Sequence, residues 1–162
     1  MARGLIPYRV AALFVGAGAI VLVGCAAIEP AIMPEPAVTA GPSPELEPEE
    51  VVRLQIEALQ TGTPNDFDGE LLYVFASFDF RSAFDGVEEF TEHLTRRPYA
   101  PLIGHREAQY HPLELDNSLA RQDVTVVSAD GERRRFGFLL TRGGGEDCSD
   151  CWFLEAVRAY VD

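Results

Sequence analysis

Residues 121–142, RQDVTVVSADGERRRFGFLLTR, decide the fold class of this chain. Apolar and polar side chains alternate on both sides of the central SADGE segment, which is typical of strands with one buried face. Asp-Gly, at residues 130–131, is a favoured pair for the turn of a β-hairpin. We therefore predict an antiparallel hairpin with strands at residues 121–128 and 133–142. Its buried face should carry Val124, Val126, Phe136, Phe138 and Leu140.

Two more strands are predicted beside this hairpin. Residues 108–115 precede it, and residues 151–161 follow it with Trp152 and Leu154 on one face. Arg133-Arg134-Arg135 opens the second hairpin strand, and we interpret this basic run as a solvated sheet edge that opposes aggregation.

Helical spacing precedes the strands. Pro48 suits the first turn of a helix that places Val52, Ile56 and Leu59 on one face. A second helix is predicted through residues 71–75, capped by Asp66 or Asp68, and a third through residues 90–94, opened by a capping box of Asp85 and Glu88. Helices followed by antiparallel strands indicate an α+β fold, with N-terminal helices packed on a curved antiparallel sheet.

The N-terminus has the order of an export signal. Arg3 and Arg9 precede an uncharged apolar run at residues 10–23, which Gly24 and Cys25 follow. Leu-Val-Gly-Cys at residues 22–25 resembles the lipobox of prokaryotic lipoproteins. That resemblance implies that residues 1–24 are a lipoprotein signal peptide and that Cys25 becomes the lipidated first residue.

An uncleaved membrane anchor is the alternative, because the uncharged stretch continues to Ile28. Both interpretations place the two arginines in the cytoplasm and the chain from Glu29 onward across the membrane. We therefore expect a membrane-attached protein on the extracytoplasmic side of the cell envelope.

Proline and glutamate dominate the segment after the signal. The prolines are Pro30, Pro34, Pro36, Pro42, Pro44 and Pro48. Proline fixes φ and removes a backbone donor, so residues 25–48 are predicted to be an extended tether. Residues 49–162 are then one α+β domain.

The charge of the chain excludes one class of partner. Its 162 residues carry 26 acidic and 13 basic side chains, for a net charge of -13. Such a chain repels phosphate backbones, so nucleic acid is not an expected partner.

Several segments of the domain resemble one known family in their order along the chain. They are Val51–Leu59 (VVRLQIEAL), Tyr73–Ser77 (YVFAS), Arg81, Phe84, Phe90, Tyr99–Leu102 (YAPL), Asp130-Gly131 and Trp152–Leu154 (WFL). On these residues the chain is identified as a member of the domain-of-unknown-function 4864 family, which is similar to NTF2-like and cystatin-like proteins. The resemblance implies a bent sheet wrapped around helices as a cone, hollow or filled. It implies no reaction, because the family has none assigned.

Cys148 and Cys151 are the sharpest local feature of the domain. In an exported chain this spacing favours a disulfide that closes the loop before the last strand. Free redox-active thiols and a metal site are the alternatives. Acidic neighbours would raise a thiol pKa, and no second Cys pair or zinc-spaced His pair supplies further ligands. No metal and no cofactor are therefore expected.

Pocket candidates follow from the fold resemblance. NTF2-like enzymes that resemble ketosteroid isomerases and polyketide cyclases place an aspartate base and a phenol or histidine donor in the cone. The corresponding pool here is Tyr73, Asp79, Arg81, Tyr99, Tyr110, His111 and Asp116, and Trp152 is a further pocket candidate. Arg81 has a structural alternative as an ion-pair partner.

No sequence motif assigns any of these residues to catalysis. The leading hypothesis is a lipid-anchored binding or interaction module without catalysis of its own, whose partner is a small hydrophobic ligand or an envelope protein. The rival hypotheses are a small isomerase, cyclase or hydrolase working in the cone, and an envelope redox protein using the cysteine pair.

Overall fold

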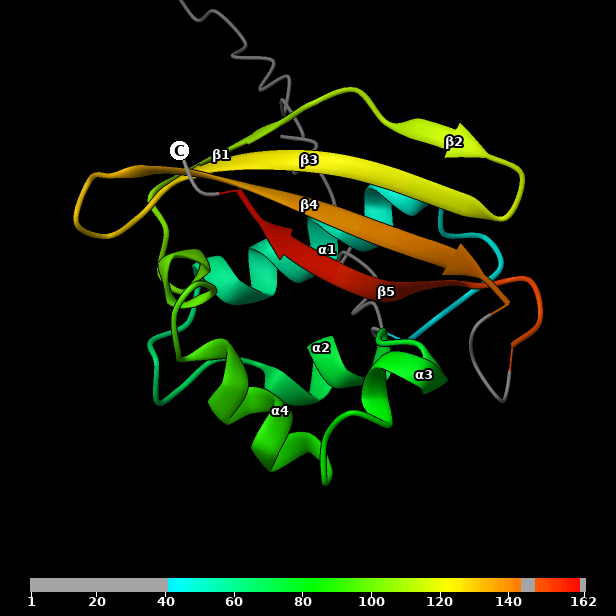
Figure 1. The fold of residues 1–162 in the computed structure, drawn as a ribbon, viewed down its shortest axis with the longest axis horizontal. Coiled ribbons are helices and arrows are strands. Elements are labelled where there is room, and N and C mark those ends of the chain that lie inside the picture. The colour runs from blue at the N-terminus through cyan, green and yellow to red at the C-terminus, as the bar shows by residue number, and fades with distance from the viewer. Residues whose placement is uncertain (1–40, 144–147, 161–162) are drawn as a thin grey trace, which may run out of the picture. The chain divides into compact units, whose positions relative to one another are not determined.

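The computed structural model describes residues 41–143 and 148–160. Four helices come first, then a short 3-10 helix and a five-stranded antiparallel sheet, which confirms the predicted α+β order. Figure 1 shows the curved, open sheet with the helices gathered behind and below it. The predicted signal peptide, Cys25 and most of the tether lie outside the described residues.

Helix α1 spans Pro48–Gln60, as its proline start predicted. Glu47 and Glu50 form a capping box, in which the backbone N–H of Glu47 donates to Glu50 Oε2 at 2.8 Å. The apolar stripe of this helix is buried, and its members are Val51, Val52, Ile56 and Leu59.

The next three helices are short. Helix α2 (Gly69–Val74) is capped by Asp68, one of the two predicted caps, whose Oδ1 accepts from the Leu71 N–H at 2.9 Å. Helix α3 (Phe78–Arg81), which the sequence analysis did not predict, begins at a Ser77 cap. Helix α4 spans Val87–Leu94.

The predicted capping box of Asp85 and Glu88 at α4 is wrong. Gly86 is the N-cap, at φ 93°, and Glu89 rather than Glu88 accepts from the Asp85 N–H at 2.6 Å. A positive φ favours glycine, so the start of the helix lies one residue later than the acidic pattern indicated.

The strands are β1 (Glu107–Tyr110), β2 (Glu114–Asp116), β3 (Leu119–Val127), β4 (Arg133–Arg142) and β5 (Trp152–Ala159). Their order is β1-β3-β4-β5. Strand β2 pairs with the beginning of β3, on the same edge of β3 where β1 pairs with its end. The predicted hairpin is confirmed as β3 and β4, with Val124 opposite Phe136. A register shift at Leu139/Leu140 marks an irregularity between β4 and β5.

Two strand predictions need correction. The strand predicted at residues 108–115 is two short strands, and Pro112, which lacks a backbone donor, lies in the gap between them. Arg133-Arg134-Arg135 does not lie on a sheet edge, because β4 runs between β3 and β5. The arginines are solvent-exposed, but at the start of an internal strand.

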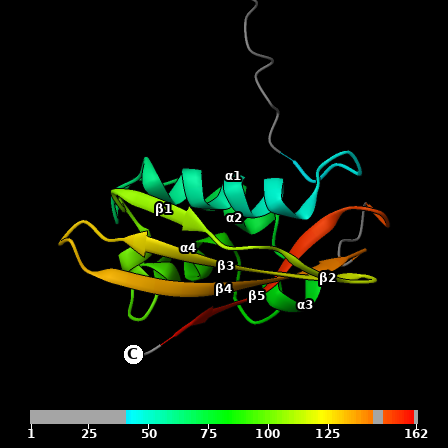
Figure 2. The same ribbon diagram turned by 90° about the horizontal axis from the view of Figure 1, so that it is seen from above.

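The core lies between the helices and one face of the sheet. Figure 2 shows α1 along that face. Val124, Val126, Phe136, Phe138 and Leu140 are at most 1% exposed, as predicted for the buried face. A short 3-10 helix, η1 (Ala100–Leu102), also belongs to this layer, with Leu102 buried. Within residues 41–143 and 148–160, no helix combines the length and the apolar character that crossing a membrane requires.

Candidate functional site

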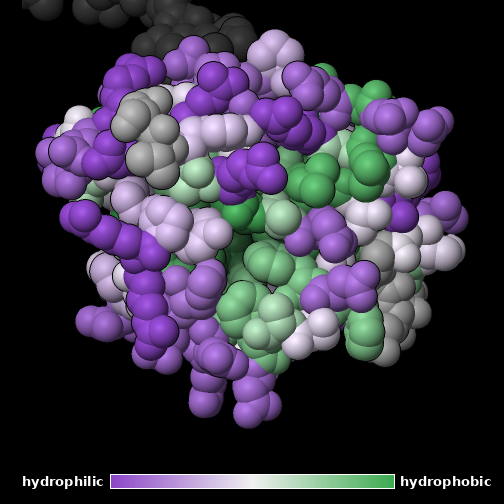
Figure 3. All heavy atoms as spheres, viewed as in Figure 1, coloured by the Kyte–Doolittle hydropathy of each residue, from purple (hydrophilic) through white to green (hydrophobic). Residues whose placement is uncertain are grey.

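A narrow cleft opens between the helices and strand β5. We call it the inner cleft, and it is lined by Gln55, Leu59, Leu72, Phe80, Phe90, His93, Leu94, Tyr99, Leu102, Phe138, Leu154 and Val157. Its free volume is about 20 Å³, enough for one water-sized group. Figure 3 shows hydrophobic residues gathered around a hollow near the centre of the viewed face. The helix-covered interior is therefore nearly filled.

Gln55 is the exception in this apolar lining. It lies on the buried face of α1 at 1% exposure, and its Nε2 has no hydrogen-bond partner among residues 41–143 and 148–160. A buried donor without a partner costs about 1–3 kcal/mol relative to one that is satisfied. The inner cleft thus presents one unsatisfied amide in an apolar wall, and it suits a group that brings an acceptor oxygen.

Aromatic side chains make the helical wall of the cleft rigid. Phe90 meets Phe80, Phe84 and Tyr73 edge to face, with ring centroids 5.3–6.0 Å apart. His93 lies between the rings of Phe84 and Tyr99, 5.2 Å from each. Such offset contacts stabilise packing beyond area burial.

The Tyr99 hydroxyl closes one end of the cleft. It donates to the Val157 carbonyl at 3.1 Å, which joins the segment before η1 to β5. His93 and Tyr99 are the titratable side chains among the described lining residues, and no carboxylate belongs to the lining. The described lining of the cleft therefore offers an apolar surface and one hydrogen-bond donor, Gln55 Nε2, that has no partner among the described residues.

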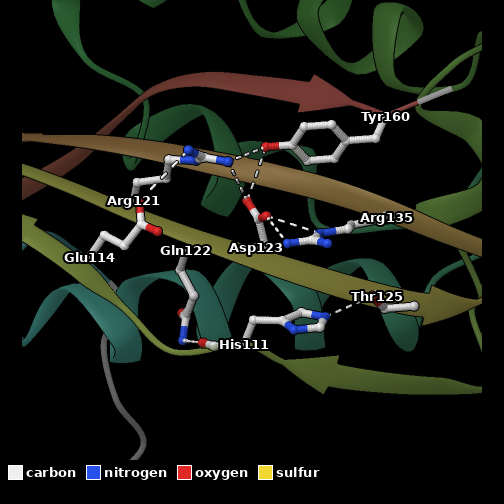
Figure 4. Close-up of polar contacts among 8 residues, drawn as sticks. All are labelled: His111, Glu114, Arg121, Gln122, Asp123, Thr125, Arg135 and Tyr160. Carbon is white, nitrogen blue, oxygen red and sulfur yellow. Dashed lines mark hydrogen bonds and ion pairs between the residues drawn. The ribbon is translucent and has the colours of Figure 1, made fainter.

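A polar network occupies the opposite, outer face of the sheet. Figure 4 shows Asp123 of β3 between Arg121 and Arg135, with the Tyr160 ring approaching from beyond the end of β5. Asp123 Oδ2 accepts from Arg135 Nε at 2.9 Å and Nη2 at 2.5 Å. Asp123 Oδ1 accepts from the Tyr160 hydroxyl at 3.1 Å and from Arg121 Nη2 at 3.4 Å. We call these four residues the Asp123 network.

The network keeps its central carboxylate ionised. Burial opposes the charge of Asp123, but the hydrogen bonds from Arg135 and Tyr160 and the nearby guanidinium charges outweigh it, so the pKa of Asp123 is lowered. Both carboxylate oxygens of Asp123 have hydrogen-bond partners. This arrangement is a structural anchor between β3, β4 and the C-terminal end of β5, since it leaves the carboxylate no free lone pair to offer a substrate.

Of the eight predicted pocket candidates, only Tyr99 lines the inner cleft, and Asp116 is exposed on β2. Tyr73 and Arg81 lie near its helical wall, where the Arg81 guanidinium stacks 5.7 Å from the centroid of the Tyr73 ring. Asp79 is exposed on α3, and its backbone carbonyl accepts from the Ser82 hydroxyl at 2.7 Å. Tyr73 and Arg81 therefore contact each other and do not line the inner cleft.

The remaining candidates lie elsewhere. Tyr110 ends β1, and burial together with the charge of Glu57 raises the pKa of its phenol. His111 follows it, and its Nε2 lies 2.9 Å from Thr125 Oγ1 on the outer face (Figure 4). Trp152 begins β5 beneath the Arg142 guanidinium. Figures 1 and 2 both place β1 and α3 at opposite ends of the molecule, so Asp79 cannot act together with Tyr110 or His111.

The sequence analysis missed Gln55, the one unsatisfied amide of the cleft. A signal for it was present. Gln55 interrupts the apolar stripe of α1 between Val52 and Ile56. A polar residue at such a position either has a hydrogen-bond partner in the protein interior or marks a binding site. Two further polar residues, His93 and Tyr99, line the cleft, and of these Tyr99 was in the candidate pool.

The predicted disulfide between Cys148 and Cys151 is confirmed, with a Cα–Cα distance of 5.5 Å. Cys151 is fully buried and immediately precedes β5, so the pair lies at a strand start. The position is outside both the inner cleft and the Asp123 network. The bond closes a short turn, residues 148–151, immediately before β5.

Comparison with known proteins identifies the family of this chain. The sequence model of the domain of unknown function DUF4864 matches residues 44–159, from just before α1 to the end of β5. The chain therefore belongs to the DUF4864 family, as its segments indicated. No curated protein and no solved structure matches it.

Proposed function

We propose that this member of the DUF4864 family is a lipid-anchored binding module, and that its inner cleft admits the acceptor oxygen of a small apolar molecule whose hydrocarbon part stays at the mouth of the cleft. The observation that carries the proposal is Gln55 Nε2, buried and unpartnered in an apolar lining. The ligand would supply the missing hydrogen bond. Its apolar part would follow the hydrophobic mouth between α4 and β5.

The energetics favour an apolar ligand with one polar atom. An apolar surface gains about 25 cal/mol for each Å² that leaves water, and a hydrogen bond to Gln55 removes the cost of a buried orphan donor. An ion gains neither, because no charged partner faces the cleft among the described residues. The protein acts by holding its ligand, without chemistry of its own.

The predicted N-terminus places this module at a membrane surface. A lipidated Cys25 would anchor the chain on the extracytoplasmic side, because two acyl chains at about 0.8 kcal/mol per buried methylene are sufficient for stable attachment. The proline-rich tether at residues 25–48 would extend the domain away from the bilayer. The ligand would then come from the envelope.

Ligand retention tests the cleft. Full-length protein is purified from membranes in a non-ionic detergent, extracted with organic solvent, and the extract is analysed by mass spectrometry. We expect one defined small molecule in the wild type and its loss in Val157→Trp, which fills the mouth. The control Leu139→Trp places the same ring on the neighbouring strand, outside the cleft lining, and should retain the molecule. Equal recovery from both variants would refute the cleft as the site.

Lipidation is tested separately with an alkyne-labelled fatty acid in growing cells. Wild-type protein should carry the label, and Cys25→Ser should lose it while accumulating as an unprocessed or released chain. Cys148→Ser is the matched control and should remain labelled. Label retained in Cys25→Ser would defeat the anchor without touching the cleft proposal.

A further inference from the structure

A second, independent hollow lies on the outer face of the sheet. It has a free volume of about 180 Å³ and is lined by Arg121, Gly137, Phe138, Leu139, Ala156, Arg158 and Tyr160. We call it the Gly137 hollow. Its location on β3, β4, β5 and the residue after β5 separates it from the inner cleft, which lies on the helix-covered side.

Strand register explains why the hollow exists. Gly137 pairs with Asp123 on one side and with Arg158 on the other, so the three residues form one row across the sheet. Gly137 contributes no side chain between the other two. A Cβ there would lie 2.7 Å from the Tyr160 hydroxyl oxygen and 3.0 Å from Asp123 Oδ1. The Asp123 network therefore requires glycine, because the Tyr160 hydroxyl and Asp123 Oδ1 lie where a Cβ would be, and the hollow opens beside Gly137.

The charges around this space are unequal. Asp123 is saturated by Arg121, Arg135 and Tyr160, and Glu114 approaches Arg121 at 3.7 Å. Arg158 is solvent-exposed and forms no ion pair with any residue in the described parts of the chain. The hollow thus has one uncommitted guanidinium, a second that is half-exposed, and an apolar floor at Leu139 and Ala156.

We propose that the Gly137 hollow binds a small organic carboxylate, with its carboxylate on Arg158 and the outer edge of Arg121. Guanidinium groups recognise carboxylates through parallel N–H···O bonds, and these charge-assisted bonds are about twice as strong as neutral ones. The hydrocarbon part of the ligand lies on Leu139 and Ala156. The volume suits an acid of a few carbons rather than a drug-sized molecule, which usually occupies about 300 Å³ or more.

A hydrogen bond within the Asp123 network supports this role for Arg121. Its Nη2 donates to the Tyr160 hydroxyl at 2.6 Å, which fixes the side chain on the sheet without consuming all of its donors. A guanidinium held in place loses less rotamer entropy when an anion binds. Arg158 lacks such support and should order on binding.

The test is a titration of the isotope-labelled full-length chain, in a non-ionic detergent, with butyrate as the probe and butyramide as its uncharged counterpart. Backbone amide shifts of Gly137, Ala156 and Arg158 are followed by NMR. We expect saturable shifts with butyrate and none with butyramide. Arg158→Gln should weaken butyrate binding about tenfold or more, because a hydrogen bond to a charged group is lost.

Three variants keep this result interpretable. Arg134→Gln removes an exposed arginine of β4 that pairs with Glu132 and does not line the hollow, and it should bind butyrate like the wild type. Ala156→Leu fills the apolar floor and should weaken binding while leaving Arg158 in place. Val157→Trp, which blocks the inner cleft, should not affect butyrate, so this site and the proposed function fail separately.

Several outcomes would overturn the inference. Equal shifts with butyrate and butyramide would mean that charge is not recognised. Inorganic phosphate that binds as tightly as butyrate would mean that the apolar floor contributes nothing. Equal weakening in Arg158→Gln and Arg134→Gln, or no saturation with tens of millimolar butyrate, would remove the site.

Discussion

The two faces of the same sheet treat buried polar groups in opposite ways. On the outer face, Asp123 is 7% exposed and accepts hydrogen bonds from three side chains. On the helix-covered side, Gln55 Nε2 and Gln122 Oε1 are buried without a partner. A buried polar group with all its hydrogen bonds made stabilises the fold, whereas one without a partner can still form a hydrogen bond.

This contrast explains why the conspicuous charged cluster is not our candidate for the principal ligand site. The carboxylate of Asp123 has no free capacity, so its arginines and Tyr160 mainly join strands. Gln55 is inconspicuous in the sequence, yet among the buried atoms without a partner in the described residues its Nε2 belongs to the residue that lines the cleft. We therefore look for the principal ligand site at Gln55 rather than at the Asp123 network.

The largest expected change in the free energy of unfolding comes from removing a large buried side chain on the helix-covered face of the sheet. Phe138 of β4 is 1% exposed and faces the helices, whereas its neighbour Leu139 points to the outer face. Phe138→Ala should lower the free energy of unfolding by about 3–5 kcal/mol, through lost burial and the cavity left behind. Leu139→Ala should cost less than about 1 kcal/mol.

Urea denaturation of the full-length chain measures both variants, with the fluorescence of Trp152, the single tryptophan, as the readout. Similar losses in the two variants would show that the faces are not differentiated in the way the structure indicates.

A smaller effect is expected from breaking the outer anchor. Asp123→Asn removes the charge that Arg135 and Arg121 share, and we expect a loss of about 2 kcal/mol, less than for a fully buried pair because both arginines are half-exposed. Glu114→Gln is the matched control, since it removes an exposed carboxylate from the same Arg121. Its free energy of unfolding should be unchanged within error. An equal loss in both would mean that burial of Asp123 is irrelevant.

The smallest expected effect is a pH dependence on the helix-covered side. His105 is 2% exposed, its Nδ1 lies 2.8 Å from the Leu102 carbonyl oxygen, and its Nε2 has no partner. Burial lowers the pKa of this imidazole below 6.5, although the bond to Leu102 opposes the shift. The unfolded chain therefore binds a proton that the folded protein resists, and stability falls as pH drops below about 6.5.

The slope should reach at most about 1.4 kcal/mol per pH unit. His105→Asn keeps an N–H for the Leu102 carbonyl but does not titrate, so the fall in unfolding free energy between pH 7 and 5.5 should become shallower. An unchanged slope in His105→Asn would contradict the inferred burial of a neutral imidazole.

The regular pattern of the hairpin made much of the fold predictable. Alternation in β3 and β4, the Asp-Gly turn and the proline at the start of α1 all correspond to local physics, and the structure follows them. Two details of the predicted elements were wrong for local reasons that the alternation and the acidic pattern obscured. Pro112 divides the predicted first strand, and the positive φ of Gly86 displaces the acidic cap of α4.

The candidate site was less predictable than the fold. The fold resemblance directed attention to titratable residues such as Asp79 and His111, and packing places these on different elements with partners of their own. Gln55 carries no charge and belongs to no motif. Its importance depends on what its neighbours fail to offer, which is a property of the folded interior and not of local sequence.

Native mass spectrometry of the full-length chain released from detergent micelles tests the central claim most directly. The wild type should carry a small molecule of one defined mass, and Gln55→Leu, which keeps the side-chain volume but removes the donor, should be bare. Gln60→Leu makes the same substitution at the exposed end of α1 and should keep the adduct. The same adduct on Gln55→Leu, or a bare wild type, would contradict a cleft that binds through this amide.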